Sequence, residues 1–336
     1  MNNPAVSVVV TVYNGEKFIQ RTIEAILNQS FQDFEIVIVD DGSSDNSKTI
    51  LEECLKTDSR IRAIFQSNGG PAKARNAGLN IAVGEYIIFI DIDDRIESNM
   101  LERMYNTANT TGADIVVCGF DRIDSNTGKV ISKEMCNADK SIVVDYETVP
   151  FINASLWNKL IRRDCIGDLK LPDIRVCEDG LFFLQLIPHV DKIVLLSEAL
   201  YHYMVYDNTV ISSLDSQEYE KIKDAFLTVS QNMDSLKKDQ MILAAFIHLV
   251  ISLLYRLSYN KDIDIKKEIR KTKYFFNSNF QGYYRTTYMR LAFLRKRGIR
   301  GLAIWITILL FRMNLIQIFL LLYRFMIDKL KINIKW

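Results

Sequence analysis

The sequence predicts an α/β fold, in which a mostly parallel, doubly wound sheet is followed by a helical region. Up to residue 120, short apolar runs rich in β-branched residues alternate with segments whose apolar residues recur at helical spacing. Such alternation of strand and helix is typical of parallel sheets covered on both faces. From 217 to 276 the spacing is helical throughout. A chain of 336 residues with 49% apolar side chains can bury a substantial core.

Short-range patterns define the elements of the N-terminal part. The first β-branched run is closed by Tyr13-Asn14-Gly15, and a Gly-Gly-Pro break precedes the third helix. Ser44 is a suitable N-cap for the second helix. The predicted elements are strands over 6–12, 34–39, 61–66 and 86–90, with helices over 16–29, after Ser44, and over 72–82.

Three carboxylates follow the fourth predicted strand directly, in the sequence Asp91-Ile92-Asp93-Asp94. Alternation along an extended backbone places Asp91 and Asp93 on one side of the chain. Crowded carboxylates repel one another and are costly to bury unless a cation neutralises them. Mg²⁺ or Mn²⁺ bridged to phosphate oxygens suits this pair. The alternative, a solvated acidic turn, fits the tripeptide alone equally well.

Three polar residues fall at the carboxyl ends of predicted strands: Thr11, Asp41 and Asp91. In doubly wound sheets, ligands bind beyond these ends, near the point where the strand order reverses. We therefore expect the three side chains to converge on one ligand site.

The next stretch of the chain is less regular. Asn126-Thr127-Gly128 has turn chemistry and predicts a polar hairpin or loop excursion over 121–145. The other predicted elements are helices over 98–112, 151–163 and 177–187, a strand over 114–120, and short strands over 192–196 and 200–206.

Composition disfavours several classes of protein. The five cysteines show no CxxC spacing, which favours a reduced, cytosolic chain without a zinc site. The three histidines show no metal-ligand spacing, and no GxGxxG follows the first strand, so a dinucleotide-dependent oxidoreductase is disfavoured. No cleavable apolar segment precedes that strand, so we expect no signal peptide. No nucleic-acid partner is expected.

Several motifs together resemble family 2 glycosyltransferases of the GT-A fold. Those of the first hundred residues match in order and spacing, and two later ones resemble the family's acceptor-side motifs. The resemblance extends over about residues 5–210 and implies a nucleotide-sugar donor with Mn²⁺ or Mg²⁺ as cofactor. The motifs occupy 6–15, 39–45, 74–78, 84–94, 157–160 and 178–182.

For the nucleoside, the resemblance implies a pocket lined by Thr11 and Tyr13, where the aromatic ring stacks on a pyrimidine. It implies that Asp41 accepts the imide N–H of the base, which suits uracil. Tyr13 as a core aromatic and Asp41 as a turn-former or helix cap are the structural alternatives.

For the diphosphate and sugar, the resemblance implies four further roles. Arg75 lies near the diphosphate, where its guanidinium pairs with anionic oxygens. Asp91 holds the ribose hydroxyls, Asp93 holds the metal between the two phosphates, and Asp94 supports the turn or the donor sugar. A solvated charge on a helix is the alternative for Arg75.

On the acceptor side, the resemblance implies that Asp179, or Glu178 in second place, is the general base that deprotonates the acceptor hydroxyl. Both acids could instead cap the following helix, since acids favour that end of the helix dipole. The two roles are compatible. Trp157 is expected in packing, with stacking on a sugar as the alternative.

The C-terminal end is basic and apolar. From residue 282 onward, Asp328 is the sole acid against eleven bases. Arg312 and Asn314 interrupt the apolar segments 301–310 and 315–323, and neither segment reaches the ~20 residues of a membrane span. We expect helices in the interface of a membrane, with Trp305 and Tyr323 at headgroup depth. A core helix pair and a single span over 301–323 are the alternatives.

These features together predict a catalytic nucleotide-sugar-binding domain over 1–210, a helical extension over 211–281 and membrane-associating helices over 282–336. The expected activity is metal-dependent, inverting transfer from a nucleotide-sugar, foremost a UDP-sugar, to a glycan or lipid-linked oligosaccharide. Its expected setting is capsule or other cell-surface polysaccharide synthesis at the cytoplasmic face of the cell membrane. The alternatives are a non-catalytic, membrane-docked nucleotide-binding scaffold and an Asp-x-Asp phosphotransferase, the latter disfavoured by the late strand position and by Arg95.

Overall fold

The computed structural model describes residues 3–136, 142–144, 146–206, 214–231 and 233–328. The chain forms two compact units, the first comprising 1–145 with 153–209, the second 146–152 with 210–336. The division into three parts at 210 and 281 stays a prediction.

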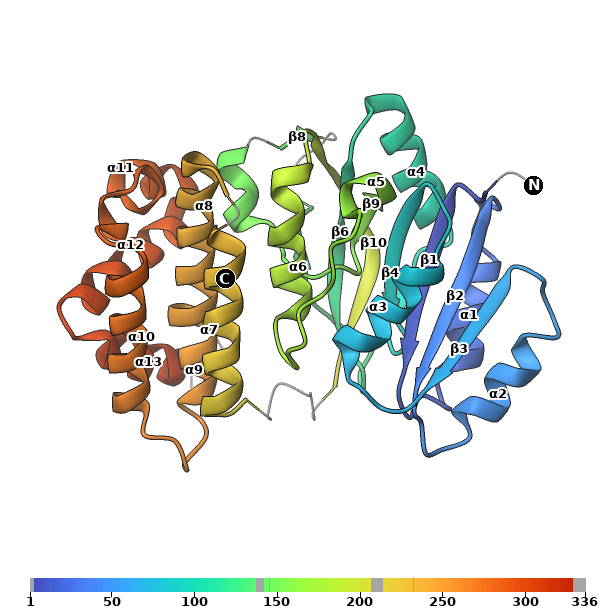
Figure 1. Cartoon of the computed structure of the whole chain (residues 1–336), viewed down its shortest axis with the longest axis horizontal. Helices are drawn as coiled ribbons and strands as arrows, with labels where there is room; N and C mark the ends of the chain where they lie inside the picture. The colour runs from blue at the N-terminus through green and yellow to red at the C-terminus, as the bar shows by residue number, and fades with distance from the viewer. Residues whose placement is uncertain (1–2, 137–141, 145, 207–213, 232, 329–336) are drawn as a thin grey trace. The chain divides into compact units, whose positions relative to one another are not determined.

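A ten-stranded, mixed sheet forms the centre of the first unit, in the order β3-β2-β1-β4-β9-β6-β10-β5, with β7 beside β6 and β8 beside β10 (Figure 1). The neighbours β3-β2-β1-β4 and the pair β6-β10 are parallel. The strands are β1 (Val6–Val12), β2 (Phe34–Asp41), β3 (Ile61–Gln66), β4 (Tyr86–Asp91), β5 (Arg95–Ile96), β6 (Ile115–Asp124), β7 (Val130–Glu134), β8 (Ile142–Val143), β9 (Lys159–Arg162) and β10 (Ile193–Val205).

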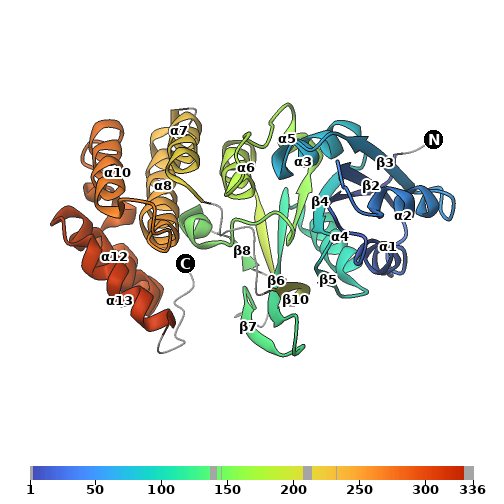
Figure 2. The ribbon, with the colours of Figure 1, turned by 90° about the horizontal axis from the view of Figure 1, so that it is seen from below.

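Helices cover both faces of this sheet, with α3 and α6 on one side and α1 and α4 on the other (Figure 2). Alternate β1 residues such as Val8 and Val10 join the apolar cluster under α1 and α4. Val9 faces the other way, and a Cβ at Gly78 would lie 2.5 Å from its side chain, so glycine permits the close approach of α3. The helices are α1 (Ile19–Leu27), α2 (Ser47–Cys54), α3 (Pro71–Ile81), α4 (Met100–Thr111), α5 (Arg163–Ile166) and α6 (Glu178–Leu186).

The doubly wound α/β fold is thus confirmed, but three local predictions were wrong. The helix over 151–163 is absent, because Ile161 pairs with Ile87 of β4 and Ile115 of β6, so this segment supplies an antiparallel strand. The two short strands near 200 are one irregular strand, β10, which shifts register against β6. Ser44 does not cap α2, which begins at Ser47 after Asn46.

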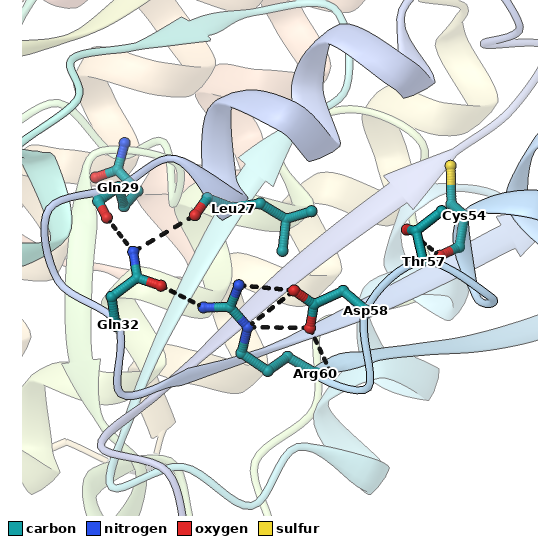
Figure 3. Close-up of polar contacts among 7 residues, drawn as sticks. All are labelled: Leu27, Gln29, Gln32, Cys54, Thr57, Asp58 and Arg60. Atoms are coloured by element: carbon teal, nitrogen blue, oxygen red, sulfur yellow. Dashed lines mark hydrogen bonds and ion pairs between the residues drawn. The ribbon is translucent and has the colours of Figure 1, made fainter.

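A hydrogen-bonded network fixes the sheet at the edge where β2 and β3 begin (Figure 3). Gln32 Nε2 donates to the carbonyl oxygens of Leu27 and Gln29. Arg60 donates from Nη1 to Gln32 Oε1 at 2.7 Å and pairs with Asp58 at 2.7 Å. These contacts join the α1–β2 connection to the α2–β3 connection, at the edge opposite the carboxyl ends of the strands.

The described part of the second unit is helical, as predicted for 217–276. Phe246, Phe276 and Phe311 are fully buried against one another, with ring centroids 5.5–6.0 Å apart. The main segments are a 3₁₀ helix (Tyr146–Phe151), α7 (Ser216–Gln231), α8 (Ser235–Ala245), a π-helical segment η4 (Phe246–Leu253), α9 (Leu254–Leu257), α10 (Ile265–Asn279), α11 (Leu291–Leu294), α12 (Gly298–Arg312) and α13 (Ile316–Asp328).

The last two helices exclude one of the predicted alternatives. α12 ends at Arg312, and Asn314 adopts a left-handed conformation with φ of 63° before α13 begins. A single continuous span over 301–323 is therefore wrong. Among the described residues, one helical stretch, Lys237–Leu257, is long and apolar enough to cross a membrane, and 78% of its apolar window is buried within the protein, as in a core helix.

Candidate active site

Neighbouring strands bring the predicted strand-end residues to one edge of the sheet. The parallel register of β1 and β4 pairs Thr11 with Asp91. β2 lies on the other side of β1 and ends at Asp41. The expectation that these three residues lie at adjacent strand ends therefore agrees with the register of the sheet.

The carboxylate of Asp41 organises the loop that leads into α3. Its Oδ1 accepts from Gln66 Nε2 at 2.7 Å and from the Gly69 N–H at 2.9 Å, while Oδ2 accepts from the Gly70 N–H at 2.8 Å. Gly70 has φ of 88°, a conformation that favours glycine. Asp41 thus does serve the loop, and because a carboxylate offers about four lone-pair sites, it keeps capacity for a further donor.

Tyr13 lies in a cross-linked surface loop and is 56% exposed, so the core-aromatic alternative is wrong. The Asn14 N–H donates to Ser43 Oγ at 2.9 Å, and the Ser44 N–H donates to Asn14 Oδ1 at 2.8 Å. The Gly15 N–H donates to Ser47 Oγ at 2.9 Å. These bonds hold the loop after β1 against the loop after β2 and leave the Tyr13 ring accessible.

Arg75 is buried at the centre of the site. Its Nη2 lies 2.9 Å from Asp91 Oδ1, and its Nη1 lies 2.6 Å from Glu178 Oε1. Burial lowers the pKa of Arg75, but Asp91 and Glu178 outweigh it and raise the pKa above its ordinary value. The solvated-charge alternative for Arg75 is therefore wrong. On the same helix, the Asn76 side-chain amide exchanges two hydrogen bonds with the Leu171 backbone, which holds the segment before α6 against α3.

The acidic loop after β4 is held by its backbone. Arg21 Nη2 donates to the Asp93 carbonyl at 3.0 Å, and Thr22 Oγ1 donates to the Ile92 carbonyl at 2.7 Å, both from α1. The Tyr206 hydroxyl donates to the same Asp93 carbonyl at 3.2 Å. Because the anchors use carbonyl groups, the side chain of Asp93 is left available.

Asp94 faces inward and supports the turn. Its Oδ2 accepts from the Tyr201 hydroxyl at 2.7 Å, and its Oδ1 accepts from the Met204 N–H at 2.8 Å. Burial and the neighbouring charges of Asp91 and Asp93 raise the pKa of Asp94 well above its ordinary range. Of the two predicted roles, this geometry favours support of the turn over contact with the sugar.

The two acids at the start of α6 have different environments. Glu178 is buried against Arg75, and burial together with Asp179 raises its pKa to about 7. Asp179 is half-buried, its Oδ1 accepts from the Gly180 N–H at 2.7 Å, and burial raises its pKa. Both acids lie in the first turn of α6, where the helix dipole favours them, and Asp179 bonds a backbone N–H of that turn, so the capping role predicted as an alternative is compatible with its geometry.

Lys159 is fully buried close to Asp179, and its Nζ donates to neutral oxygens. The acceptors are the carbonyls of Asn153 and Ser155, both at 2.5 Å, and Asn158 Oδ1 at 2.9 Å. Burial lowers the pKa of Lys159 to about 7, although Asp179 acts in the opposite direction. The lysine therefore fixes the segment that leads into β9.

Aromatic packing places Trp157 in the core rather than in a cleft. Its ring stacks on Tyr201 and Tyr203 with centroids 4.4 and 5.6 Å apart, and meets Phe120 edge-on at 4.7 Å. It is buried. The packing role expected for Trp157 is confirmed.

The donor set around Asp93 fits a divalent cation supplied with a phosphate ligand. Among the described residues, no other residue donates a hydrogen bond to the Asp93 carboxylate, and burial together with Asp91 raises its pKa while Arg21 acts to lower it. In the described ranges, no cluster of three or more His, Cys, Asp or Glu side chains is arranged to hold a metal. A cation here would therefore take much of its coordination from substrate and water, as Mg²⁺ does.

Three residues of the site were missed at the level of sequence: Arg21, Lys159 and Tyr201. Each acts across a long sequence separation or on a backbone group, such as Arg21 on the carbonyl of Asp93, 72 residues away. Lys159 lies inside the motif at 157–160. Its lack of an acidic neighbour in the sequence was the one available signal that it belongs to the site.

The fold, the carboxylates at its strand ends and the similarity to known enzymes together place the chain among the glycosyltransferases. The family model described as glycosyl transferase family 2 matches residues 7–170. The chain is 32% identical over 286 residues to the uncharacterized glycosyltransferase EpsJ of Bacillus subtilis, covering 80% of this chain and 83% of EpsJ. The chain belongs to glycosyl transferase family 2.

Two further proteins are similar to this chain. The putative teichuronic acid biosynthesis glycosyltransferase TuaG of Bacillus subtilis is 29% identical over 211 residues, 62% of this chain and 82% of TuaG. The crystal structure of Staphylococcus aureus TarS 1-349 in complex with UDP-GlcNAc superposes with a TM-score of 0.67 at 21% identity, covering 90% of each chain. The structural likeness confirms the GT-A fold.

Proposed function

We propose that this glycosyltransferase uses a divalent metal, Mn²⁺ or Mg²⁺, to move a sugar from a UDP-sugar to a glycan hydroxyl with inversion at the anomeric carbon. The observation that carries the proposal is the double ion pair of Arg75. It joins Asp91, at the end of β4, to Glu178, at the start of α6. The ion pairs therefore connect the proposed donor groups to Glu178, the residue directly before the proposed base, Asp179.

The donor half of the site would be formed by the strand ends. Tyr13 presents an accessible ring for a pyrimidine, with Thr11 on the strand beneath it and Asp41 as acceptor for the base N–H. Asp91 keeps one carboxylate oxygen outside its bond to Arg75 and would accept from a ribose hydroxyl. A nucleotide fits these groups because each contact pairs a donor with an acceptor.

The diphosphate would lie between Arg75 and the acidic loop. Arg75 offers a fixed guanidinium that pairs with anionic oxygens. Asp93 would hold the metal, which when bound neutralises charge on the departing diphosphate. Asp94 keeps the loop in place through Tyr201.

The acceptor half would use Asp179 as general base. Its carboxylate accepts a hydrogen bond from the Gly180 N–H through one oxygen and is half-buried, so its other oxygen would accept from an acceptor hydroxyl. A raised pKa strengthens it as a proton acceptor near neutral pH. Glu178 is the second choice because Arg75 occupies it. One base on the face opposite the leaving group is what an inverting displacement requires.

The acceptor would be a glycan or a lipid-linked oligosaccharide of a bacterial cell-surface polysaccharide, such as a capsule, handled at the cytoplasmic face of the cell membrane. Two observations support this choice: the similar protein TuaG is a putative teichuronic acid biosynthesis glycosyltransferase, and the C-terminal end of this chain is strongly basic and apolar. No nucleic-acid partner is proposed.

A panel of nucleotide-sugars, each incubated with the full-length protein with and without Mn²⁺, tests the proposal by release of free nucleotide. UDP-sugars are expected to be hydrolysed or transferred in the presence of Mn²⁺. A non-catalytic scaffold would bind the nucleotide-sugar but would release no free nucleotide from it. A phosphotransferase would release inorganic phosphate or a phosphosugar instead of UDP.

A further inference from the structure

The helices α12 and α13 each expose a row of large apolar side chains. Along α12 the exposed residues recur at helical spacing, and Ile299 is 83% exposed. Along α13 the same spacing recurs, and Leu321 is 69% exposed. We call this surface the α12–α13 apolar face, which comprises Ile299, Leu302, Ile306, Ile318, Leu321 and Phe325.

The opposite sides of the same helices are buried in the second unit. Ile304, Ile308 and Phe311 of α12 are buried, and Phe311 packs on the aromatic core around Phe246. In α13, Leu320 and Tyr323 are buried, and Tyr323 meets the ring of Tyr255. α12 and α13 also contact each other. Each helix therefore has one apolar side in the core of the unit and a second apolar side on its surface.

Exposed apolar side chains gathered on two neighbouring helices mark an interaction site, whereas isolated ones do not. Soluble helices ordinarily present polar side chains opposite their buried side. Here the sequence from 291 to 327 contains no acidic residue at all. The surface is therefore apolar and cationic together.

The bases near this face fall into two groups. Arg312 and Arg324 are directed onto the protein itself, with guanidinium carbons 3.9 Å from the Tyr284 ring and 4.3 Å from the Tyr259 ring. Arg295 and Lys296, just before α12, are exposed. The sequence adds Lys329, Lys331 and Lys335 after α13, which lie outside the described residues.

We propose that the α12–α13 apolar face docks on an anionic lipid surface, with the two helices lying in the plane of the interface. Apolar side chains flanked by bases and free of acids match the chemistry of such a surface, in which acyl chains lie beneath anionic headgroups. A second copy of the chain is a poorer occupant, because two surfaces of the same positive charge would face each other. Within the described residues, α12 and α13 are each shorter than a bilayer requires, which favours helices that lie on the surface over helices that span it.

Co-sedimentation of the full-length protein with vesicles tests this directly. The vesicles contain phosphatidylcholine alone or with one third phosphatidylglycerol. The wild type is expected to sediment with the anionic vesicles and to be released only in part by 0.5 M NaCl, since salt screens charge but not apolar burial. Arg295→Gln with Lys296→Gln is expected to weaken binding about ten-fold at low salt, and much less at high salt.

Leu321→Glu with Phe325→Glu is expected to weaken binding at least ten-fold at both salt concentrations. A matched control is Ile131→Glu, which changes an aliphatic residue of similar exposure on β7 in the first unit and should bind as the wild type does. Leu321→Ser with Phe325→Ser removes apolar contact without adding charge and should lose the salt-resistant binding. The unfolding midpoint of each variant is measured to confirm that it folds.

Three results would overturn the proposal. The wild type could remain in the supernatant with anionic vesicles. The variants at Leu321 and Phe325 could bind as the wild type does while folded. Light scattering could show a wild-type dimer that these variants convert to a monomer, which would assign the face to a second copy of the chain. None of these readouts depends on transfer activity, so a failure here leaves the proposed donor chemistry untouched and removes only the support that the C-terminal end gives to a membrane-linked acceptor.

Discussion

Arg75 Nη1 lies 2.6 Å from Glu178 Oε1, joining α3 to α6 across 103 residues of sequence. Both side chains are about nine-tenths buried. Burial raises the pKa of Glu178 to about 7, while Arg75 acts to lower it. Forming this buried ion pair therefore costs desolvation free energy. The pair fixes the first turn of α6, in which Asp179 directly follows Glu178.

Replacing Arg75 with Met should destabilise the first unit by about 3–5 kcal/mol, because the buried carboxylate of Glu178 and the half-buried carboxylate of Asp91 would lose their partner. Equilibrium unfolding in urea measures this. Arg103→Met is the control, since it removes an exposed ion pair with Glu198 and should cost less than about 1 kcal/mol. Equal losses in the two variants would show that the buried pair contributes no more than a surface pair does.

Asp93→Asn should abolish donor turnover and should weaken nucleotide binding only when Mn²⁺ is present. The amide keeps the shape but is a poor ligand for a hard cation. Calorimetric titration with UDP, with and without Mn²⁺, measures the difference. Asp173→Asn, at an exposed acid in the same unit, is the control. Normal turnover by Asp93→Asn, or full wild-type activity in chelator, would contradict the metal assignment.

The sequence was sufficient for the strand ends of the site. Val6–Val12 and Tyr86–Asp91 are short runs rich in β-branched and aromatic residues, which favours buried strands, and the rule for ligands at carboxyl ends then places Thr11 and Asp91 at the same edge. Their pairing in the β1–β4 register agrees with this expectation. Local pattern and global fold are consistent here.

Prediction from local sequence patterns failed where pairing between distant segments decides the structure. The apolar residues of 151–163 fit a helix by spacing, yet β9 forms because β4 and β6 both offer it hydrogen-bonding partners. No local pattern could show that Tyr201 would reach Asp94, 107 residues earlier in the chain. The predicted helix that carries Arg75 has no acidic residue at helical spacing from it. The sequence therefore could not predict that Arg75 is buried between two carboxylates.

Asp179→Asn should leave the affinity for UDP nearly unchanged and lower transfer by roughly 10²–10⁴-fold, the usual scale of general-base catalysis. The carboxamide cannot accept the proton of the acceptor. Transfer to a soluble glycan acceptor and UDP binding are measured on the same preparation. If Asp179→Asn transferred normally and Glu178→Gln did not, the base would be Glu178.

Lys159→Met should change how stability depends on pH. Burial lowers the pKa of Lys159 from 10.5 to about 7 in the folded protein, so between pH 7 and about 10 the unfolded chain binds more protons than the folded one. The stability contributed by the neutral lysine is thus complete above its unfolded pKa and is lost as the pH falls through about 7. The free energy of unfolding of the wild type should gain about 2 kcal/mol relative to Lys159→Met from pH 7 to 9.

Urea unfolding of both proteins at pH 7, 8 and 9 measures that gain, because groups common to the two proteins cancel in the difference. A constant offset is expected as well, since the oxygens of Asn153, Ser155 and Asn158 lose their donor, at about 1–3 kcal/mol for buried acceptors left unsatisfied. Lys73→Met, at an exposed lysine of α3, should run parallel to the wild type across the range. Parallel curves for Lys159→Met would mean that Lys159 stays charged in the folded protein, with its three oxygens and Asp179 outweighing burial.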